Sequence, residues 1–335
     1  MSKYRNRLPQ LKDQLFITDG GLETTLIYHD GLDLPAFAAF DLLKDDAGLA
    51  ILRGYFARYA ELARSHSLGL VLEAPTWRAN ADWGAKLGYD ARALADANRK
   101  AIGLLLEIRD EFESPTTKIV ISGNLGPRGD GYVATSRMSA GEAQDYHASQ
   151  IKTFAQTDVD MVAAFTMNYV EEAIGIATAA KSYAMPVAIS FTLETDGRLP
   201  SGDTLAQAIV RTDDETGNYP AYYMINCAHP THFEGVLREG GAWRERIRGL
   251  RANASMRSHA ELDRSTDLDA GNPEELGTQH AALYSMLPQL TVVGGCCGTD
   301  HRHVDAICRS MGLIRSAHAG NVTAAATESA RNHVR

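Results

Sequence analysis

Three of the four cysteines in this chain lie at the ends of two apolar segments. Cys227 falls in YMINCAH, and the adjacent Cys296 and Cys297 fall in VVGGCCGTD. Three thiolates that converge on one point hold zinc with a fourth position open, as catalytic zinc sites do. Cys308 lies in a helical pattern, where we expect a small buried apolar residue. The pattern therefore predicts a zinc site made of Cys227, Cys296 and Cys297.

The adjacent pair reaches one metal ion only if the backbone turns. Neighbouring residues of a regular strand point to opposite faces, so Cys296 and Cys297 need a bend between them. The flanking Gly294, Gly295 and Gly298 supply that freedom. Two other interpretations stay open: a disulfide between the adjacent cysteines, and a third cysteine that is only a buried apolar residue.

The charge of such a site indicates its chemistry. Zinc with three thiolates carries a net charge of −1, which makes it a poor Lewis acid for water or a carbonyl. A thiol that arrives as the fourth ligand loses its proton and stays nucleophilic. A cationic methyl donor would be attracted by the negative charge and by aromatic faces. The site therefore predicts methyl transfer from a sulfonium or quaternary ammonium to a thiol.

The elements that must position these cysteines recur along the whole chain. Eight apolar segments alternate with helical patterns, which is typical of a (β/α)8 TIM barrel with its site at the C-terminal ends of the strands. An open doubly wound sheet is the second candidate. In a barrel, the ends of strands 6 and 8 lie about 10 Å apart, within reach of one ion. The predicted strands fall within 15–21, 68–77, 117–126, 159–167, 185–193, 221–229, 246–255 and 289–299.

The helical patterns have recognisable starts. Ser139 and Glu142 form a capping-box pattern, and Thr299 or Asp300 is a ready N-cap for the last helix. The predicted helices span 46–66, 91–113, 139–157, 170–183, 203–211, 231–239, 274–286 and 300–310.

Three connections after strands are long, at 77–90, 126–140 and 256–275. Long loops on the catalytic face of a barrel commonly cover or select substrate, although tolerated insertion is the alternative. The loop GPRGDGY at 126–132 lacks the GK[ST] ending of a phosphate loop, so it predicts no nucleotide site.

Composition narrows the class of protein. The 335 residues carry a net charge of −9, which argues against nucleic acid or an anionic membrane as partner. No apolar run approaches the roughly 20 residues of a membrane helix. Four cysteines do not resemble a disulfide framework, so a reducing cytoplasm is the expected compartment. We expect one barrel domain at 1–314 and a polar tail at 315–335.

The chain resembles the homocysteine S-methyltransferase family, zinc-dependent barrels that methylate homocysteine to methionine. The resemblance runs from about Phe16 to Met311 and is carried by three motifs. These are Asp19-Gly20-Gly21 after strand 1, Ile225-Asn226-Cys227 on strand 6 and Gly294-Gly295-Cys296-Cys297-Gly298-Thr299 on strand 8. It implies zinc as cofactor and a small-molecule thiol and methyl donor as partners. A sulfonium donor, S-methylmethionine or S-adenosylmethionine, is favoured because no cobalamin or folate module accompanies the barrel; betaine stays open.

The resemblance also assigns substrate contacts. Asp19 becomes a catalytic and substrate-binding candidate for the amino group of homocysteine, with the backbone of Gly20 and Gly21 near its carboxylate. The alternative for Asp19 is a turn-forming residue before two glycines. Asn226 and Thr299 are expected to donate hydrogen bonds to the sulfurs.

One position departs from the family pattern. Many relatives carry a substrate-binding Glu at the end of strand 4, where this chain has Phe165, whose ring face attracts a cation only weakly. Glu73 after strand 2 or Glu194 after strand 5 would supply the missing carboxylate. Glu73 is therefore the second catalytic candidate, with a cap or a pair with Arg78 as its structural alternative.

Two other functions compete with homocysteine methylation. Phe165 also suits a different acceptor, another thiol or a selenol. A non-catalytic barrel that senses zinc or thiols would bind both without turnover. An assembly of identical subunits stays open.

Overall fold

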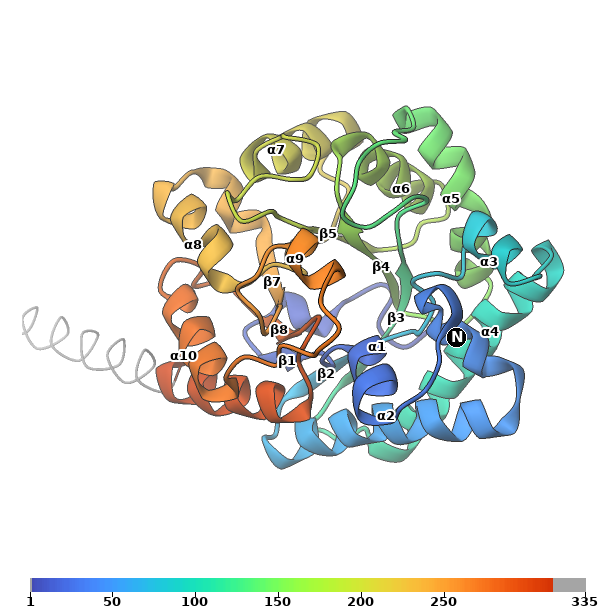
Figure 1. Cartoon of the computed structure of the whole chain (residues 1–335), viewed down its shortest axis with the longest axis horizontal. Helices are drawn as coiled ribbons and strands as arrows, with labels where there is room; N and C mark the ends of the chain where they lie inside the picture. Colours follow the sequence, from blue (N-terminus) through green and yellow to red (C-terminus); the bar gives the residue numbers. More distant parts are fainter. Residues whose placement is uncertain (1, 316–335) are drawn as a thin grey trace, which may run out of the picture.

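The computed structural model describes residues 2–315, which form a closed barrel of eight parallel strands (Figure 1). The strands are hydrogen-bonded in chain order, and β1 pairs with both β2 and β8 to close the sheet. The predicted TIM barrel is thus confirmed and the open sheet excluded. The strands are β1 Phe16–Ile17, β2 Gly69–Glu73, β3 Ile119–Leu125, β4 Met161–Met167, β5 Val187–Phe191, β6 Tyr222–Asn226, β7 Ile247–Ala252 and β8 Val292–Gly295.

Helices surround the barrel and cover its outer face (Figure 1). They are α1 Leu22–Thr24, α2 Asp46–Ser65, α3 Ala81–Lys86, α4 Ala91–Phe112, α5 Ala140–Ala155, α6 Val170–Ser182, α7 Leu205–Thr216, α8 Pro230–Glu239, α9 His259–Asp263 and α10 Pro273–Tyr284. Residues 301–315 are also helical. Shorter helical turns occupy Pro9–Leu11, Thr25–His29, Pro35–Phe37, Ala39–Lys44 and Ala242–Arg246.

The strands are apolar on both faces because the barrel buries both. One cluster fills the interior and includes Phe16, Val120 and Met224. A larger cluster lies between the strands and the helices and includes Ile17, Phe56 and Ile189. Adjacent residues such as Phe16 and Ile17 thus belong to opposite layers, which explains the near-continuous apolar runs.

Most boundaries lie close to the predicted ones, and the exceptions have local causes. β1 is only two residues long, although the backbone beyond it stays hydrogen-bonded to β8 through Thr18 and Asp19. α7 continues beyond the predicted 211 to Thr216 and stops where Gly217 adopts a left-handed conformation, with φ +69°. Three short helices, α1, α3 and α9, lie in connections that the sequence predicts only as loops.

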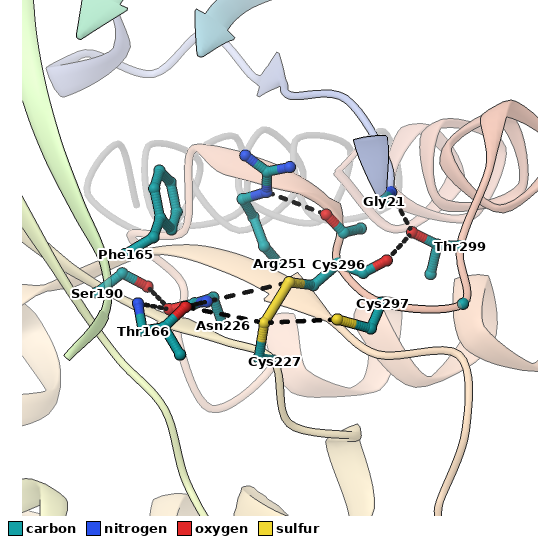
Figure 2. Close-up of a disulfide and its surroundings, with 12 residues drawn as sticks. Gly21, Phe165, Thr166, Ser190, Asn226, Cys227, Arg251, Cys296, Cys297 and Thr299 are labelled. Carbon is teal, nitrogen blue, oxygen red and sulfur yellow. Dashed lines mark hydrogen bonds between the residues drawn. A yellow bond between two sulfur atoms is a disulfide. The ribbon is translucent and has the colours of Figure 1, made fainter. Parts of the chain in front are cut away.

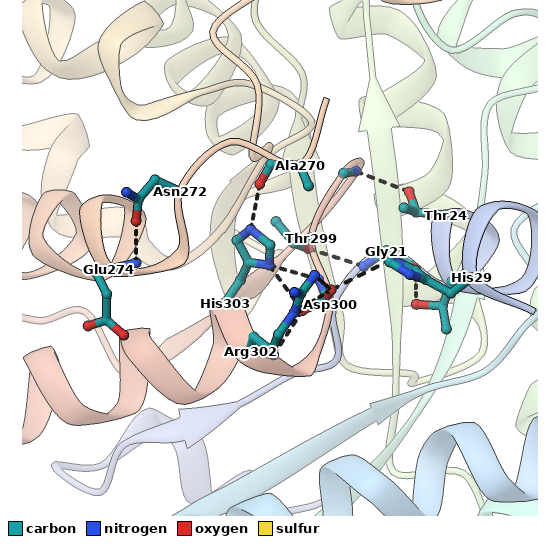
Figure 3. Close-up of polar contacts among 12 residues, drawn as sticks. Gly21, Thr24, His29, Ala270, Asn272, Glu274, Thr299, Asp300, Arg302 and His303 are labelled. Atoms are coloured by element: carbon teal, nitrogen blue, oxygen red, sulfur yellow. Dashed lines mark hydrogen bonds and ion pairs between the residues drawn. The ribbon is translucent and has the colours of Figure 1, made fainter. Parts of the chain in front are cut away.

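Two predicted helix starts are confirmed in detail. Ser139 and Glu142 form the reciprocal capping box of α5. Of the two candidates for the last helix, Asp300 is the cap, since its carboxylate accepts a hydrogen bond from the Arg302 backbone N–H at 2.9 Å (Figure 3). The Nε2 of His303 lies 2.7 Å from the Ala270 carbonyl, so the start of the last helix contacts the loop after β7. The start of the last helix, which directly follows the cysteine loop, is therefore held against the connection after β7.

The polar tail predicted at 315–335 lies outside the described residues except for Arg315. Within residues 2–315, none of the helices has the length and apolar character needed to span a bilayer.

Candidate metal centre and substrate site

The three predicted cysteines meet at one rim of the barrel, although they follow two different strands (Figure 2). Cys227 directly follows β6, and Cys296 and Cys297 directly follow β8. Their sulfur atoms all lie within 4.8 Å of one another, and the Sγ atoms of Cys227 and Cys297 are 3.9 Å apart. Tetrahedral zinc with bonds of about 2.3 Å would separate its sulfur ligands by ~3.8 Å. The cluster therefore has the donor atoms of a metal site, and the separation of Cys227 and Cys297 fits two ligands of one ion.

Cys227 and Cys296 are joined as a disulfide, while Cys297 and Cys308 are free thiols (Figure 2). The alternative disulfide between the adjacent Cys296 and Cys297 is thus wrong in its pairing. Metal ligation requires thiolates, so the disulfide must be reduced before all three sulfurs act as ligands. Cys308 is 2% exposed within the last helix, as expected for a structural residue.

Strained backbone brings the sulfurs together. Cys227 has φ +53° and Thr166, at the end of β4, has φ +62°, a region that non-glycine residues rarely adopt. Such outliers concentrate at functional sites. The prediction that glycines supply the bend on β8 holds only for Gly298, with φ +80°. Gly294 and Gly295 continue the strand, and any side chain there would collide with Thr18 or Thr299.

Asn226 connects the strained segments behind the sulfurs (Figure 2). Its Oδ1 accepts hydrogen bonds from the Thr166 backbone N–H at 3.0 Å and from the Ser190 hydroxyl at 2.6 Å. Its Nδ2 lies 4.0 Å from the Sγ of Cys296, as predicted for a donor to sulfur. Thr299 does not play that role, because its hydroxyl donates to the Cys296 carbonyl at 2.7 Å.

Asp19 is buried beside the cluster and already has two partners. Arg251 on β7 donates to its Oδ1 at 2.7 Å, and the Tyr55 hydroxyl donates to its Oδ2 at 3.0 Å. Burial still raises the pKa of Asp19, against the lowering effect of Arg251. The turn that follows needs glycine, because a Cβ on Gly20 would lie 2.8 Å from the Tyr59 hydroxyl and one on Gly21 would lie 2.7 Å from the Cys296 carbonyl.

The backbone of Gly20 and Gly21 already forms hydrogen bonds within the protein, so it is less available to a substrate carboxylate than expected. The Gly21 N–H donates to the Thr299 carbonyl at 3.0 Å, and the Gly20 carbonyl accepts from Tyr55 and Arg251. The pair thus joins the start of the barrel to its last strand. This contact fixes Asp19 beside the cysteine loop.

Glu73 ends β2 and points toward the same buried network. It is 3% exposed, and among residues 2–315 its Oε2 has no hydrogen-bond partner. Burial raises its pKa to about 7, while the charge of Arg251 and the hydroxyl of Ser122 act in the lowering direction. Among residues 2–315 no ion pair joins Glu73 to Arg78, and Arg251 is the arginine whose charge acts on it, so the Arg78 pairing is wrong while a structural role as a cap stays open. A buried carboxylate with an unpaired oxygen is suited to a cationic ligand.

Phe165 lies on β4 and its ring packs against an arginine. Its ring centre is 5.0 Å from the guanidinium carbon of Arg251 (Figure 2). The charges of Asp19, Glu73 and Glu23 together raise the pKa of Arg251 against the lowering effect of burial. Three carboxyl groups therefore act on one buried arginine, and burial raises the pKa of each of them.

Glu23 is a site residue that the sequence reasoning missed. It lies on α1, four residues after Asp19, and is half-buried. Burial raises its pKa to about 7, and the charge of Asp19 adds to that rise. Its charge also raises the pKa of the Cys297 thiol. Its position two residues after the glycine pair was the available signal.

Glu194 reaches the cluster through a histidine. Its Oε1 is 3.1 Å from Nδ1 of His259 on α9, and the other ring nitrogen of His259 contacts the Cys227 carbonyl at 2.5 Å. The His259 ring also lies against Tyr132, with ring centres 4.2 Å apart. The Tyr132 hydroxyl is 3.6 Å from the Sγ of Cys297.

Each of the three long loops thus brings a side chain to the rim. Tyr132 comes from the loop after β3 and His259 from the loop after β7. Arg78, from the loop after β2, interacts electrostatically with Glu23 and Tyr132. The sequence predicted a role for these loops and named Arg78 only as a possible partner of Glu73; it did not identify Tyr132, His259 or Arg251 of β7.

Comparison with known proteins identifies the family of this chain. The sequence model of the homocysteine S-methyltransferase family matches residues 16–311. The chain belongs to the homocysteine S-methyltransferase family. It is therefore a methyltransferase-type enzyme, as the sequence motifs predicted.

Relatives of the family cover nearly the same length. Homocysteine S-methyltransferase 1 of Brassica oleracea var. italica is 21% identical over 325 residues, covering 88% of this chain and 93% of the relative. Its counterpart in Arabidopsis thaliana is 19% identical with the same coverage.

Solved structures show the same fold. The oxidised form of the homocysteine methyltransferase MmuM from Escherichia coli superposes with a TM-score of 0.72 at 16% identity, over 91% of this chain and 99% of that chain. Its metallated form gives a TM-score of 0.67, also at 16% identity, over 89% and 96%.

Proposed function

We propose that this protein is a zinc-dependent S-methyltransferase that moves a methyl group from a sulfonium donor to homocysteine, giving methionine. The observation that carries the proposal is the convergence of Cys227, Cys296 and Cys297 at the strand ends of a family barrel. S-methylmethionine or S-adenosylmethionine is the proposed donor. The low cysteine count and the need for reduced sulfurs suit a cytoplasmic setting.

The residues present fit zinc. Three thiolate ligands favour zinc over the oxygen-seeking metals, and a three-residue set leaves a position for substrate. When bound, zinc would hold the acceptor sulfur as a thiolate near neutral pH. Asn226 and Tyr132 flank Cys296 and Cys297 and would orient these ligands.

The carboxylates beside the cluster would hold the acceptor's ammonium group. Phe165 removes the carboxylate that many relatives place on β4, whereas Glu73 has an unpaired buried oxygen and a pKa of about 7. An ammonium beside Glu73 would favour its ionised form and satisfy that oxygen. Asp19, with Gly20 and Gly21, would line the same pocket. Because Asp19 is already paired with Arg251, we assign Glu73 the larger share of the binding.

Glu194 has a positioning role in this proposal rather than a direct substrate contact. Its ion pair with His259 orients a ring that contacts the Cys227 carbonyl. His259 would thus help to keep Cys227 in its left-handed conformation.

The test is methionine formation, measured by mass spectrometry on reduced, zinc-loaded protein. Homocysteine is supplied with S-methylmethionine, S-adenosylmethionine or betaine in separate reactions. We expect methionine with a sulfonium donor, loss of the product in Cys297→Ala, and retention in the matched control Cys308→Ala. Glu73→Gln should raise the KM for homocysteine, and unchanged kinetics would refute its role.

Phe165 motivates a second candidate, the same transfer to a different thiol or to a selenol. The aromatic ring in place of a carboxylate reduces the charge available for an amino-acid ammonium. Product with another acceptor, but none with homocysteine, would favour this candidate. Tight zinc and thiol binding without turnover of any pair would favour a non-catalytic sensor.

A further inference from the structure

Arg78 is a buried cation held at the rim of the barrel by aromatic rings. It is 8% exposed and opens the long loop after β2. Its guanidinium carbon lies 4.1 Å from the ring centre of Trp77 and 3.6 Å from that of Trp83. Its Nη1 donates to the Gly129 carbonyl at 3.2 Å. Two tryptophans and a backbone carbonyl thus fix the orientation of this side chain.

The arginine lacks an anionic partner of its own. Within residues 2–315 it forms no ion pair with a carboxylate, and its Nε is buried without a hydrogen-bond partner. Burial lowers its pKa to about 10, although the charges of Asp130, Tyr132 and Glu23 oppose that change. A buried charge without a paired partner is costly, so folded proteins keep one mainly where a ligand completes it.

The location of Arg78 connects it to the cysteine cluster. Its charge interacts with Glu23, which in turn acts on Cys297, and with Tyr132, whose hydroxyl is 3.6 Å from the Cys297 sulfur. The neighbouring Trp77 donates from its indole N–H to the Phe165 carbonyl at 3.4 Å. Arg78 therefore belongs to the surroundings of the proposed methyl-transfer site.

We propose that Arg78 is a specificity-determining residue that binds a carboxylate carried by a substrate of the cysteine site. The rings of Trp77 and Trp83 lie against the guanidinium and Gly129 accepts from Nη1, so the buried Nε and its neighbour Nη2 form the edge that has no hydrogen-bond partner among residues 2–315. This edge matches the two oxygens of a carboxylate. Glu23 offers the opposite charge nearby, so the pair suits a zwitterion.

This inference rests on the proposed function, in which both substrates carry a carboxylate. The acceptor homocysteine has one, and so does a sulfonium donor such as S-methylmethionine. The shared chemistry is a guanidinium–carboxylate pair, and the experiment must tell which substrate provides it.

The experiment measures dissociation constants by calorimetry on reduced, zinc-loaded protein. Two matched ligand pairs are used: homocysteine with homocysteamine, and S-methylmethionine with (3-aminopropyl)dimethylsulfonium. The second member of each pair lacks only the carboxylate. The proteins are wild type, Arg78→Gln, Arg78→Lys and the control Arg128→Gln, which alters an exposed arginine of the neighbouring loop.

In at least one of the two ligand pairs, we expect wild type and Arg128→Gln to bind the member with the carboxylate about tenfold or more tightly than the member without it. In Arg78→Gln that preference should fall below about twofold, and the pair that changes identifies the source. Arg78→Lys should keep part of the preference because it retains the charge but loses two-point pairing. If Arg78→Gln does not fold, a drop of several fold in Arg78→Lys supports the same conclusion.

A preference that persists in both Arg78 variants would overturn the inference, as would a wild type that shows no carboxylate preference in either pair. Failure of the proposed function has a different signature. There, methionine formation would be absent while the Arg78-dependent carboxylate preference remained.

Discussion

Arg251 on β7 donates a hydrogen bond of 2.7 Å to the carboxylate of Asp19, and both side chains are buried. The two residues are 232 positions apart in sequence. In the sheet, Arg251 lies beside Gly294 of β8 and Asn226 of β6, which places its charge at the level of the cysteine cluster. The ion pair therefore joins β7 to the segment that follows β1, and Arg251 also donates to the Gly295 carbonyl of β8 at 3.0 Å.

Breaking this pair should be strongly destabilising. Arg251→Met leaves Asp19 buried without its cation, and removal of one partner of a buried pair costs about 3–5 kcal/mol. The loss should be larger at pH 8 than at pH 5, because Asp19 relieves it at low pH by taking up a proton. Urea denaturation at both pH values measures the effect.

The double variant Asp19→Asn/Arg251→Met is the control for that prediction. It removes both charges, so we expect it to be more stable than Arg251→Met alone. Equal stability of the single and double variants would show that the pairing does not account for the loss.

Glu73 should make the protein less stable as the pH rises. Its pKa is about 7 in the folded chain against an ordinary value of 4.5. Between these values the folded state binds more protons than the unfolded state, so the free energy of unfolding falls with rising pH. The loss of unfolding free energy that Glu73 causes is absent below about pH 4.5 and reaches about 3 kcal/mol above pH 7.

Glu73→Gln removes this titration, so its unfolding free energy should change less between pH 5 and 8 and should exceed that of wild type at pH 8. Thermal and urea unfolding across that range give the two curves. Glu107→Gln, at an exposed site, is the matched control and should follow wild type. Parallel curves for wild type and Glu73→Gln would contradict the assignment.

The barrel was predictable from the sequence because both faces of its strands are buried, which produces near-continuous apolar runs. Residues such as Phe16 and Ile17 are both apolar since one faces the interior and the other faces the helices. The cysteine motifs lie directly after their strands, so the strand count placed Cys227 within reach of Cys296 and Cys297, one strand away on the same rim. Ser139 and Asp300 were predictable for the same reason, because helix caps act over three residues.

The electrostatic network was not predictable because it depends on contacts across the barrel. Arg251 is one of three arginines in the predicted strand segment 246–255, and only the closed sheet reveals that the charges of Asp19, Glu23 and Glu73 act on it. Thr299 was misassigned because the turn at Gly298 directs its hydroxyl to a carbonyl rather than to a sulfur.

Metal binding should require all three clustered cysteines in reduced form. Each of Cys227→Ser, Cys296→Ser and Cys297→Ser should lower the zinc content of reduced protein well below one ion per chain, since each removes a thiolate. Elemental analysis after dialysis against a weak chelator measures the content. Cys308→Ser is the matched control and should retain zinc, because Cys308 is buried in the last helix.

The disulfide between Cys227 and Cys296 makes this requirement testable without mutation. Protein handled without reductant should bind little zinc, and reduction under argon should restore binding. Full zinc content in unreduced protein that still carries the disulfide would argue against the three-thiolate site.

Asn226 should tune the metal site without touching the metal. Asn226→Ala removes the amide that lies 4.0 Å from the Cys296 sulfur and the acceptor that holds the Thr166 backbone. Loss of such an outer contact typically weakens metal affinity by about 10- to 100-fold. Competition with a chromophoric chelator on reduced protein gives the affinity.

Ser190→Ala separates the two roles of Asn226. It removes only the hydroxyl that donates to Oδ1 of Asn226 at 2.6 Å and leaves the amide beside the sulfur in place. We therefore expect a smaller loss of zinc affinity than in Asn226→Ala. If Ser190→Ala weakens zinc as much as Asn226→Ala does, the orientation of the amide matters more than its contact with Cys296. If neither variant changes the affinity, the strained backbone at Thr166 and Cys227 holds the sulfurs without help from this network.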